Sequence, residues 1–151
     1  MTTMGVTIRP VKSEDRAEWD VLYQGYATFY HVDQTEEMRD TVFGWLMDDE
    51  HSCNGLVALD DSGKLIGLTH YRPFASPLRA LTNCFLDDLF VDPAARGSGA
   101  ADALIAGVAE VARQNGWPVV RWITADDNYR GRGVYDKVAT RTMWVTYDLK
   151  V

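Results

Sequence analysis

The sequence predicts a single mixed α/β domain, spanning residues 1–151, whose sheet is mostly antiparallel and flanked by helices. First, 151 residues with 46% hydrophobic and 25% charged side chains match one compact globular domain with its own core. Second, segments with helical spacing of apolar residues alternate with short apolar runs that are typical of strands. Third, the expected order β-α-α-β-β-β-α-β-α-β places three strands in succession, which favours antiparallel pairing inside an α/β domain.

The first half of the chain predicts one strand, two helices and a hairpin. We expect a strand at 6–11 and a helix capped by Ser13, because a hydroxyl there can accept from free N–H groups of the first turn. Thr35 is expected to cap a second helix, and the acidic stretch 48–50 is expected to be a loop, because negative charge opposes a helix C-terminus. A hairpin follows, with strands at 55–59 and 64–71 around a turn at 60–63.

The second half predicts the central strand and a strand at the end. Pro73 and Pro77 favour a loop over 72–81. The remaining elements are expected at 84–91 (a central strand), 98–114 (helix), 119–124 (strand), 128–139 (helix) and 142–149 (strand). The last strand contains Trp144, Val145 and Tyr147, so we expect that it can pair across the edge of a homodimer.

The composition of the chain excludes some classes of function and favours others. A net charge of −7 argues against a nucleic-acid binder and favours cationic partners such as amines. Cys53 and Cys84 cannot form a disulfide framework, and the three histidines lack metal-ligand spacing, so we expect no metal. No apolar run approaches the roughly 18 residues of a membrane span. We therefore expect a soluble, cytoplasmic protein with neither a membrane nor a nucleic acid as partner.

The glycine-rich turn after the central strand is the most informative stretch. It runs Arg96-Gly97-Ser98-Gly99-Ala100-Ala101 and opens the helix expected at 98–114. Glycines let backbone N–H groups approach an anion, and a helix N-terminus adds free donors, so the turn can hold a phosphate. The alternative is a turn that only reverses the chain. A Walker A loop is absent, and the Rossmann pattern fails because Asp102 stands where Gly or Ala is required.

Two motifs resemble the GNAT N-acetyltransferase superfamily over nearly the whole chain. Arg96-x-x-Gly99-x-Ala101 is similar to the family signature Gln/Arg-x-x-Gly-x-Gly/Ala, and it follows Leu89-Phe90-Val91-Asp92-Pro93. The stretch from Asn128 to Lys137 resembles the family pattern with Asn and Tyr seven residues apart, here Asn128 and Tyr135. The aromatic positions of the first helix look most like the histone- and polyamine-acetylating branch.

The resemblance implies a GNAT-like fold and acetyl-CoA as cosubstrate. In such a fold the family's fourth and fifth strands, expected here at 84–91 and 119–124, splay apart to hold the pantetheine arm. The cofactor-binding residues implied are Leu89, Phe90, Val91, Arg96, Gly97, Ser98, Gly99, Ala100, Ala101, Asn128 and Tyr135. The backbone N–H groups of 97–101 would cradle the pyrophosphate, and those of Leu89 and Val91 would meet the thioester oxygen and the pantetheine amides.

The resemblance also implies the catalytic groups. Tyr135 matches the family's general acid, which would protonate the departing thiolate; the alternative is a tyrosine that only packs in the core. Leu89 would polarise the thioester through its N–H. The general base is open: Asp87 and Asp88 should point to opposite faces of the strand, and Asp126 is a third candidate. With no nucleophile elbow in the sequence, we expect direct attack in a ternary complex.

Two features depart from the family pattern. Ala139-Thr140 replaces the usual Gly-Phe, and Gly131 and Gly133 should each weaken the last helix by about 1 kcal/mol. The leading interpretation is an N-acetyltransferase acting on a small cationic amine, an amino acid or a lysine side chain. The aromatic residues of the first helix could line the acceptor cleft or could simply pack in the core. Alternative functions are a non-catalytic acyl-CoA-sensing domain and a nucleotide-binding module.

Overall fold

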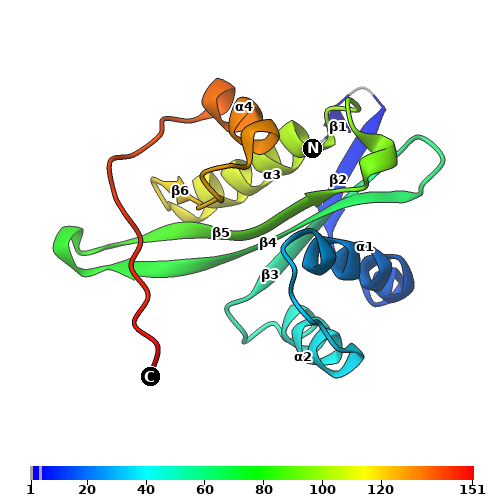
Figure 1. Cartoon of the computed structure of the whole chain (residues 1–151), viewed down its shortest axis with the longest axis horizontal. Coiled ribbons are helices and arrows are strands. Elements are labelled where there is room, and N and C mark those ends of the chain that lie inside the picture. Colours follow the sequence, from blue (N-terminus) through cyan, green and yellow to red (C-terminus); the bar gives the residue numbers. More distant parts are fainter. Residues whose placement is uncertain (1, 4) are drawn as a thin grey trace.

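A twisted six-stranded sheet in the order β1-β2-β3-β4-β5-β6 forms the centre of the molecule in this computed structural model, which describes residues 2–3 and 5–151 (Figure 1). The first four neighbouring pairs are antiparallel, whereas β6 runs parallel to β5. The predicted mixed, mostly antiparallel sheet is therefore confirmed. Its strands are β1 (Thr2–Thr3), β2 (Val6–Pro10), β3 (Asn54–Leu59), β4 (Leu65–Ser76), β5 (Leu81–Val91) and β6 (Val120–Arg121).

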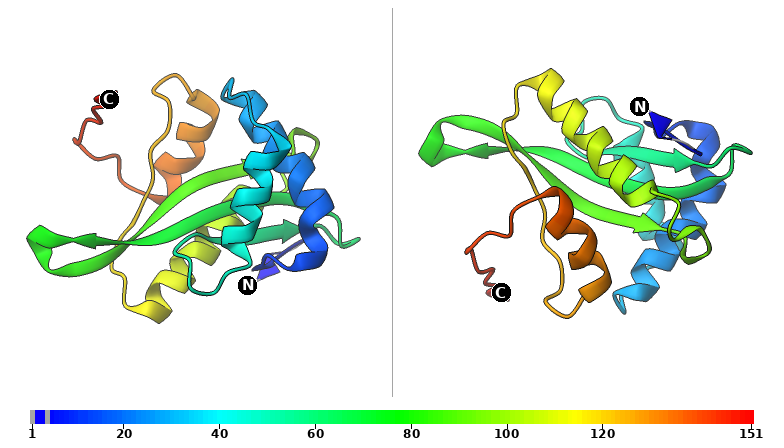
Figure 2. Two further views of the ribbon diagram at one scale, coloured as in Figure 1. Left: turned by 90° about the horizontal axis from the view of Figure 1, so that it is seen from below. Right: turned by 90° about the horizontal axis from the view of Figure 1, so that it is seen from above.

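Helices cover both faces of the sheet. In Figures 1 and 2, α1 and α2 lie on one face, and α3 lies on the other with α4 beside it. Their bounds are α1 (Arg16–Phe29), α2 (Glu36–Leu46), α3 (Ala100–Asn115) and α4 (Tyr129–Val138), with short 3₁₀ turns at Ser13–Asp15, Pro77–Arg79 and Pro93–Ala95. Within the described ranges, no helix combines the length and the apolar character needed to cross a bilayer.

The helix boundaries follow the local sequence, with one exception. Thr35 caps α2 as predicted, because its Oγ1 accepts from the Met38 N–H at 3.1 Å. Ser13 does not cap α1: it lies inside the preceding 3₁₀ turn and its hydroxyl donates to Glu14. The acidic side chain that serves this turn is Asp15, which accepts from the Lys12 N–H at 2.7 Å and from the Arg9 guanidinium.

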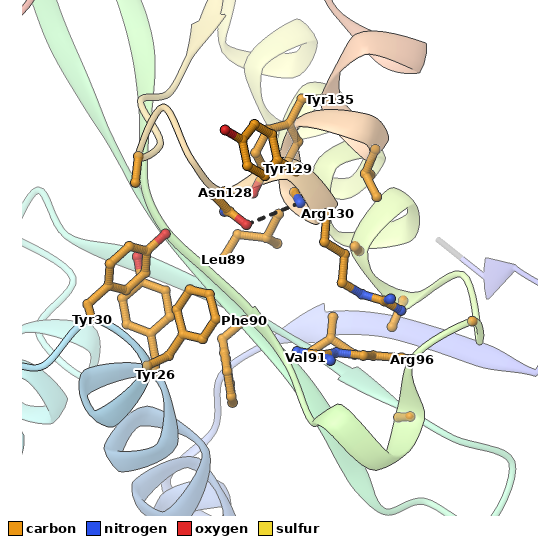
Figure 3. A pocket seen from close by; sticks show the side chains of 18 of the residues that line it. Tyr26, Tyr30, Leu89, Phe90, Val91, Arg96, Asn128, Tyr129, Arg130 and Tyr135 are labelled. Atoms are coloured by element: carbon orange, nitrogen blue, oxygen red, sulfur yellow. Dashed lines mark hydrogen bonds between the residues drawn. The ribbon is translucent and has the colours of Figure 1, made fainter.

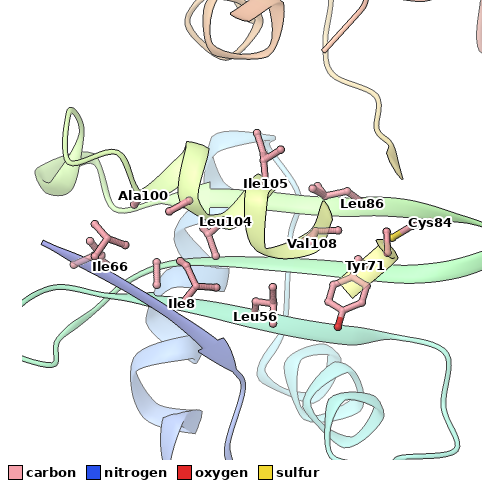
Figure 4. Close-up of a cluster of buried hydrophobic side chains, with 14 residues drawn as sticks. Ile8, Leu56, Ile66, Tyr71, Cys84, Leu86, Ala100, Leu104, Ile105 and Val108 are labelled. Carbon is pink, nitrogen blue, oxygen red and sulfur yellow. The ribbon is translucent and has the colours of Figure 1, made fainter. Parts of the chain in front are cut away.

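Two apolar clusters hold the layers together. Beneath α3, Leu104 and Val108 are fully buried against β2–β5 (Figure 4). A Cβ on Gly107 would approach Ile8 to 3.0 Å, so glycine lets α3 lie close to the sheet. On the opposite face, Trp19 of α1 is fully buried with Phe43 of α2 and Leu68 of β4.

The segment 72–81 is a hairpin extension rather than the predicted loop. Strands β4 and β5 remain paired as far as Ser76 and Leu81. Pro73 is tolerated because β3 ends opposite Tyr71, so the side of Pro73 that lacks an N–H faces no neighbouring strand. Its partner Cys84 directs its own N–H away from β4, to the Val119 carbonyl at 2.9 Å.

The predicted strand at 142–149 is absent. Residues 139–151 form no helix or strand, and every one of their side chains is exposed. Figures 1 and 2 show this segment leaving α4 and running away from the sheet. The alternating pattern of apolar residues identifies a strand-forming sequence, but within the described chain no neighbouring strand lies beside it.

Strands β5 and β6 pair only briefly and then separate. Their ladder consists of Cys84 with Val120 and Phe85 with Arg121. Further along β5, no residue of β6 lies opposite Leu89, Phe90 or Val91 in the described sheet, while β4 still pairs with all three. The predicted splay of these two strands is confirmed, and it opens the cavity described next.

Candidate active site

A cavity of about 750 Å³ fills the space between the splayed strands. Its floor is the end of β5, and its sides are the glycine-rich turn before α3, the start of α4 and the end of α1 (Figure 3). Ten of the eleven residues predicted to bind the cofactor line it, namely Leu89, Phe90, Val91, Arg96, Gly97, Ser98, Ala100, Ala101, Asn128 and Tyr135. The eleventh, Gly99, lies directly before α3 as its N-cap.

The glycine-rich turn has open space and free donors. Gly97 and Gly99 have φ of +83° and +84°, a left-handed conformation that favours glycine. A Cβ on either would meet no heavy atom of the described chain within 4 Å. The first turn of α3 adds N–H groups without intrahelical acceptors. Arg96 and Arg130 line the same end of the cavity (Figure 3). The turn therefore fits the pyrophosphate of a coenzyme A molecule.

The backbone of β5 presents donors to the cavity. The N–H of Asp92 donates to the Ile66 carbonyl on β4 at 2.8 Å. Neighbouring residues in a strand direct their N–H groups to opposite sides, so the N–H groups of Leu89 and Val91 point away from β4. On that side lies the cavity, because β6 has already diverged. These are the two backbone groups for which the family resemblance implies cofactor contacts.

Asn128 and Gly131 form a tight N-terminal turn of α4. The Asn128 Oδ1 accepts from the Gly131 N–H at 3.2 Å, and its Nδ2 donates to the Thr124 hydroxyl at 2.9 Å. A Cβ on Gly131 would lie 2.5 Å from the Asn128 Nδ2. A Cβ at 131 would therefore displace the Asn128 side chain from these hydrogen bonds, whereas a Cβ on Gly133 would meet no atom within 4 Å outside its own neighbours.

Tyr135 lies on α4 at the cavity wall. Its ring packs edge-on against Trp122, with centroids 5.5 Å apart. Burial, together with the nearby phenol of Tyr30, raises the pKa of Tyr135 above its ordinary value of 10.0. The hydroxyl is therefore protonated at neutral pH and can donate a proton. Despite two glycines, α4 forms over Tyr129–Val138 and orients this side chain to the cavity.

The aromatic residues of α1 divide between core and cavity. Trp19 and Tyr23 pack in the core beside α2, while Tyr26, Phe29 and Tyr30 line the cavity. Together with Phe90 these three form what we call the aromatic wall; ring centroids lie 5.0 Å apart for Tyr26–Tyr30 and 5.9 Å for Tyr26–Phe90. Figure 3 shows Tyr26 and Tyr30 at the end of the cavity opposite Arg96 and Arg130.

Several lining residues were not predicted. They include His31, Ala95, Asp127, Tyr129, Arg130 and Val134. For Arg130, its position two residues after Asn128 was a usable signal, because a basic side chain beside a phosphate site is expected. His31 has no such signal: it lies after α1 with φ of +57° and reaches the cavity only through the fold.

Asp87 and Asp88 do not alternate between the faces of β5. The register shifts opposite His70 and Tyr71 of β4, where Asp87 is an extra residue of β5 without a partner, a β-bulge. As a result Leu86 and Leu89, three residues apart, both pack beneath α3. Asp88 accepts from Tyr23 on the opposite face, and Asp87 accepts from Arg72, whose guanidinium lies over the ring of Phe85 between Cys84 and Leu86 of the cluster beneath α3. The expectation of opposite faces is therefore wrong.

The two carboxylates have different surroundings, and neither lines the cavity directly. Asp87 is exposed and accepts from the Arg72 Nε at 3.0 Å. Asp88 accepts from the Tyr23 hydroxyl at 2.9 Å and lies 2.8 Å from the His70 Nδ1. Burial alone would raise the pKa of Asp88, but the hydrogen bond and electrostatic attraction of His70, followed by hydrogen bonds from Tyr23 and Tyr26, outweigh it and lower that pKa from its ordinary value of 3.8. Asp88 is therefore ionised at neutral pH.

His70 is a buried, hydrogen-bonded core residue. The Trp19 Nε1 donates to its Nε2 at 3.0 Å. The other ring nitrogen, Nδ1, lies 2.8 Å from the Asp88 Oδ2. Trp19 and Asp88 together fix the orientation of the His70 ring.

No described group of three or more His, Cys, Asp or Glu side chains could hold a metal ion.

Burial is the largest effect on the two cysteine thiols, and it raises the pKa of Cys53 and of Cys84 to about 11. Both thiols are therefore protonated at neutral pH.

Residues 19–139 match the Acetyltransferase (GNAT) family, so the chain belongs to that family. The D-amino-acid N-acetyltransferase HPA3 of Saccharomyces cerevisiae is 29% identical over 143 residues, which cover 94% of this chain and 89% of the relative. The protein is accordingly an acetyl-CoA-dependent N-acetyltransferase, and acetyl-CoA is its cosubstrate.

Solved structures have the same fold. A ribosomal-protein-alanine N-acetyltransferase from Brucella melitensis biovar Abortus 2308 superposes with a TM-score of 0.80 at 24% identity, covering 97% of this chain and 99% of that one. The enzyme AAC(6')-Iy, in complex with the bisubstrate analog CoA-S-monomethyl-acetylneamine, superposes with a TM-score of 0.82 at 20% identity, covering 97% and 98%. At this level of identity the likeness establishes the fold alone.

Proposed function

We propose that this enzyme acetylates the primary amine of a small cationic acceptor, which attacks acetyl-CoA directly in a ternary complex. One observation carries the proposal: the cavity has an anion-binding end at Arg96 and Arg130 and an aromatic end at Tyr26 and Tyr30. Leu89 and Tyr135 lie between these ends. A donor bound at the first end would deliver its acetyl group toward an amine held at the second.

The donor would be held mainly by backbone groups. The N–H groups of 97–101 would contact the pyrophosphate, and the Val91 N–H would contact the pantetheine amides as a neighbouring strand would. The side chains of Arg96 and Asn128 would add contacts along the arm. The Leu89 N–H would donate to the thioester oxygen, where negative charge develops as the amine attacks.

Tyr135 would act as the general acid. As the amine nitrogen bonds to the acetyl carbon, the carbon–sulfur bond breaks and the sulfur leaves as a thiolate. The raised pKa of Tyr135 keeps its proton available for that sulfur at neutral pH. The acceptor nitrogen loses its own proton before attack, so a separate proton acceptor is required.

We assign the carboxylate on the acceptor side to Asp88, with Asp87 as the second candidate. Tyr26 links Asp88 to the cavity, because it lines the aromatic wall and its hydroxyl contributes to lowering the pKa of Asp88. A carboxylate that accepts several hydrogen bonds is a weak base, but it keeps its negative charge at neutral pH. Asp88 would therefore attract an ammonium group, and the proton would leave through a hydroxyl or water between them.

The aromatic wall supports a cationic acceptor. Faces of tyrosine and phenylalanine attract ammonium groups, and the chain's net charge of −7 favours their approach. The resemblance of α1 to the histone- and polyamine-acetylating branch supports polyamines or lysine side chains. The name of the yeast relative supports amino acids as a further class.

The test is thiol release from acetyl-CoA with four acceptor classes: polyamines, amino acids, aminoglycosides and lysine peptides. We expect an amine-dependent rate that is highest with a polycationic acceptor and is lost in Tyr135→Phe. A preference for neutral or anionic amines would overturn the assignment of the acceptor. Tight acetyl-CoA binding without thiol release from any amine would support an acyl-CoA-sensing domain instead.

A further inference from the structure

We propose that Gly25 of α1 is a positioning residue that sets how bulky an acceptor the enzyme takes. Because Gly25 has no side chain, the Phe90 ring lies back against the helix, and this keeps the aromatic end of the cavity open. The inference rests on the proposed function, since it places the acceptor at that end. Gly25 does not itself line the cavity, so it acts only through Phe90.

Gly25 lies in the interior of α1, where glycine weakens a helix relative to alanine. A close contact explains why glycine stands there. A Cβ on Gly25 would lie 3.3 Å from the Phe90 Cε2 and 3.4 Å from its Cζ, and it would approach no other described atom within 4 Å outside the adjoining turns of the helix. Both distances are shorter than a relaxed carbon–carbon contact, so an alanine would require either the ring or the helix to move.

Helix α1 is anchored on both sides of Gly25. Before it, the fully buried Trp19 donates to the His70 Nε2 at 3.0 Å. After it, Ala27 is 4% exposed. A methyl group added at position 25 would therefore displace the Phe90 ring rather than the helix.

The Phe90 ring has one open side. On the other side it packs against the buried cluster that contains Trp19 and Leu68, where close packing leaves no room. The open side forms part of the cavity, where the ring meets Tyr26 edge-on with centroids 5.9 Å apart (Figure 3). A ring displaced from Gly25 would therefore advance into the cavity and move Tyr26 with it.

The displaced ring would narrow the path of the acceptor. Phe90 follows Leu89, whose N–H would contact the thioester oxygen, so the group that carries the amine must pass the Phe90 ring to reach the acetyl carbon. One methyl group in an apolar pocket changes selectivity between substrates of different bulk by about tenfold or more. Arg96 and Arg130 lie at the other end of the cavity, so donor binding should not change.

The test compares Gly25→Ala with Gly44→Ala, the same change inside α2, where a Cβ would meet no described atom within 4 Å. Two six-carbon diamines serve as acceptors: hexamethylenediamine, with its amines on unbranched carbons, and diaminocyclohexane, with its amines on ring carbons. In Gly25→Ala, kcat/KM for the cyclic diamine should fall about tenfold relative to the linear one, with the Kd of acetyl-CoA unchanged. Gly44→Ala should keep the wild-type ratio.

Phe90→Leu tests whether the effect passes through the ring, because leucine lacks the Cε2 and Cζ atoms that Gly25 faces. Alone, this variant should raise the ratio of cyclic to linear diamine. In its background, Gly25→Ala should have no further effect on the ratio. Equal losses in both backgrounds would show that Gly25 does not act through Phe90 and would refute the inference.

NMR of labelled phenylalanine and tyrosine rings reports their positions independently of turnover. Gly25→Ala should shift the ring resonances of Phe90 and Tyr26, whereas Gly44→Ala should shift neither; unshifted rings in Gly25→Ala would contradict the inference. If the wild type acetylates both diamines and Gly25→Ala keeps their ratio, the inference fails and the proposed function stands. If the wild type accepts only the linear diamine, Phe90→Leu must admit the cyclic one, or the inference fails. If the wild type releases no thiol with any amine, the proposed function fails and the inference with it.

Discussion

The His70 Nδ1 lies 2.8 Å from the Asp88 Oδ2, and the Trp19 Nε1 donates a hydrogen bond to the other ring nitrogen, Nε2, at 3.0 Å. Contacts from Trp19 on one ring nitrogen and from Asp88 on the other hold the His70 ring in one orientation. The arrangement keeps a negative charge behind the aromatic wall without exposing it. It also ties the core between α1 and the sheet to the acceptor end of the cavity.

Asp88→Asn should lower kcat/KM for a polyamine by more than tenfold and leave the Kd of acetyl-CoA unchanged, since only the acceptor end loses charge. Steady-state thiol release and calorimetry measure the two quantities. The control is Asp61→Asn, which removes the same charge from an exposed turn. A parallel loss of acetyl-CoA binding would mean that Asp88 maintains the whole cavity rather than its acceptor end.

The pH dependence of kcat/KM should not reflect the titration of Asp88. Its pKa is lowered below 3.8, so the carboxylate is ionised from pH 5 to pH 9 and loses its charge only in stronger acid. The acid limb of kcat/KM should instead reflect deprotonation of the acceptor. We expect this limb to move when two acceptors of different amine pKa are compared; a limb fixed near pH 6 for both would indicate a titrating base on the enzyme.

Tyr135→Phe should reduce kcat by about a hundredfold or more and change the Kd of acetyl-CoA little, because it removes the proton donor and keeps the ring against Trp122. Tyr147→Phe, at an exposed position, controls for loss of a hydroxyl. Unchanged turnover in the Tyr135 variant would remove this residue from the mechanism.

Gly97→Glu should weaken acetyl-CoA binding at least tenfold, because it places bulk and negative charge in the anion-binding turn. Gly63→Glu is a matched control in the hairpin turn before β4: its φ is +84°, close to the +83° of Gly97, and no described atom lies within 4 Å of a Cβ at either site. Both variants carry the same backbone strain. Equal affinities would place the pyrophosphate elsewhere.

Gly131→Ala should weaken acetyl-CoA binding, because the added Cβ would displace the Asn128 side chain that caps α4. Gly133→Ala meets open space and should instead stabilise the helix by about 1 kcal/mol, raising Tm by a few degrees. Calorimetry and thermal denaturation check the pair. If both variants bind acetyl-CoA as the wild type does, the position of Asn128 is not critical for the donor.

The predictions from sequence were most accurate where neighbouring residues alone decide the local structure. The helix that starts after the glycine-rich turn and the cap at Thr35 depend on neighbouring residues only, and both were confirmed. The loop predicted from Pro73 and Pro77 was wrong, because Pro73 lies where β4 has no neighbouring strand on one side. That arrangement depends on the pairing of strands in the folded protein. The strand predicted at 142–149 was also wrong, because its alternating pattern favours a strand but a strand needs a neighbouring strand edge to pair with.

By itself, the sequence determined the mixed α/β class, the glycine-rich turn and the seven-residue spacing of Asn128 and Tyr135. These features depend on residues that are close in the sequence, because φ/ψ preferences and periodicity act locally. Only the tertiary structure decided that a bulge turns Asp87 and Asp88 to one face, and that α1 gives Trp19 to the core but Tyr26 to the cavity. Such outcomes depend on strand register and on which helix face meets the sheet, and both are set by packing between segments far apart in the chain.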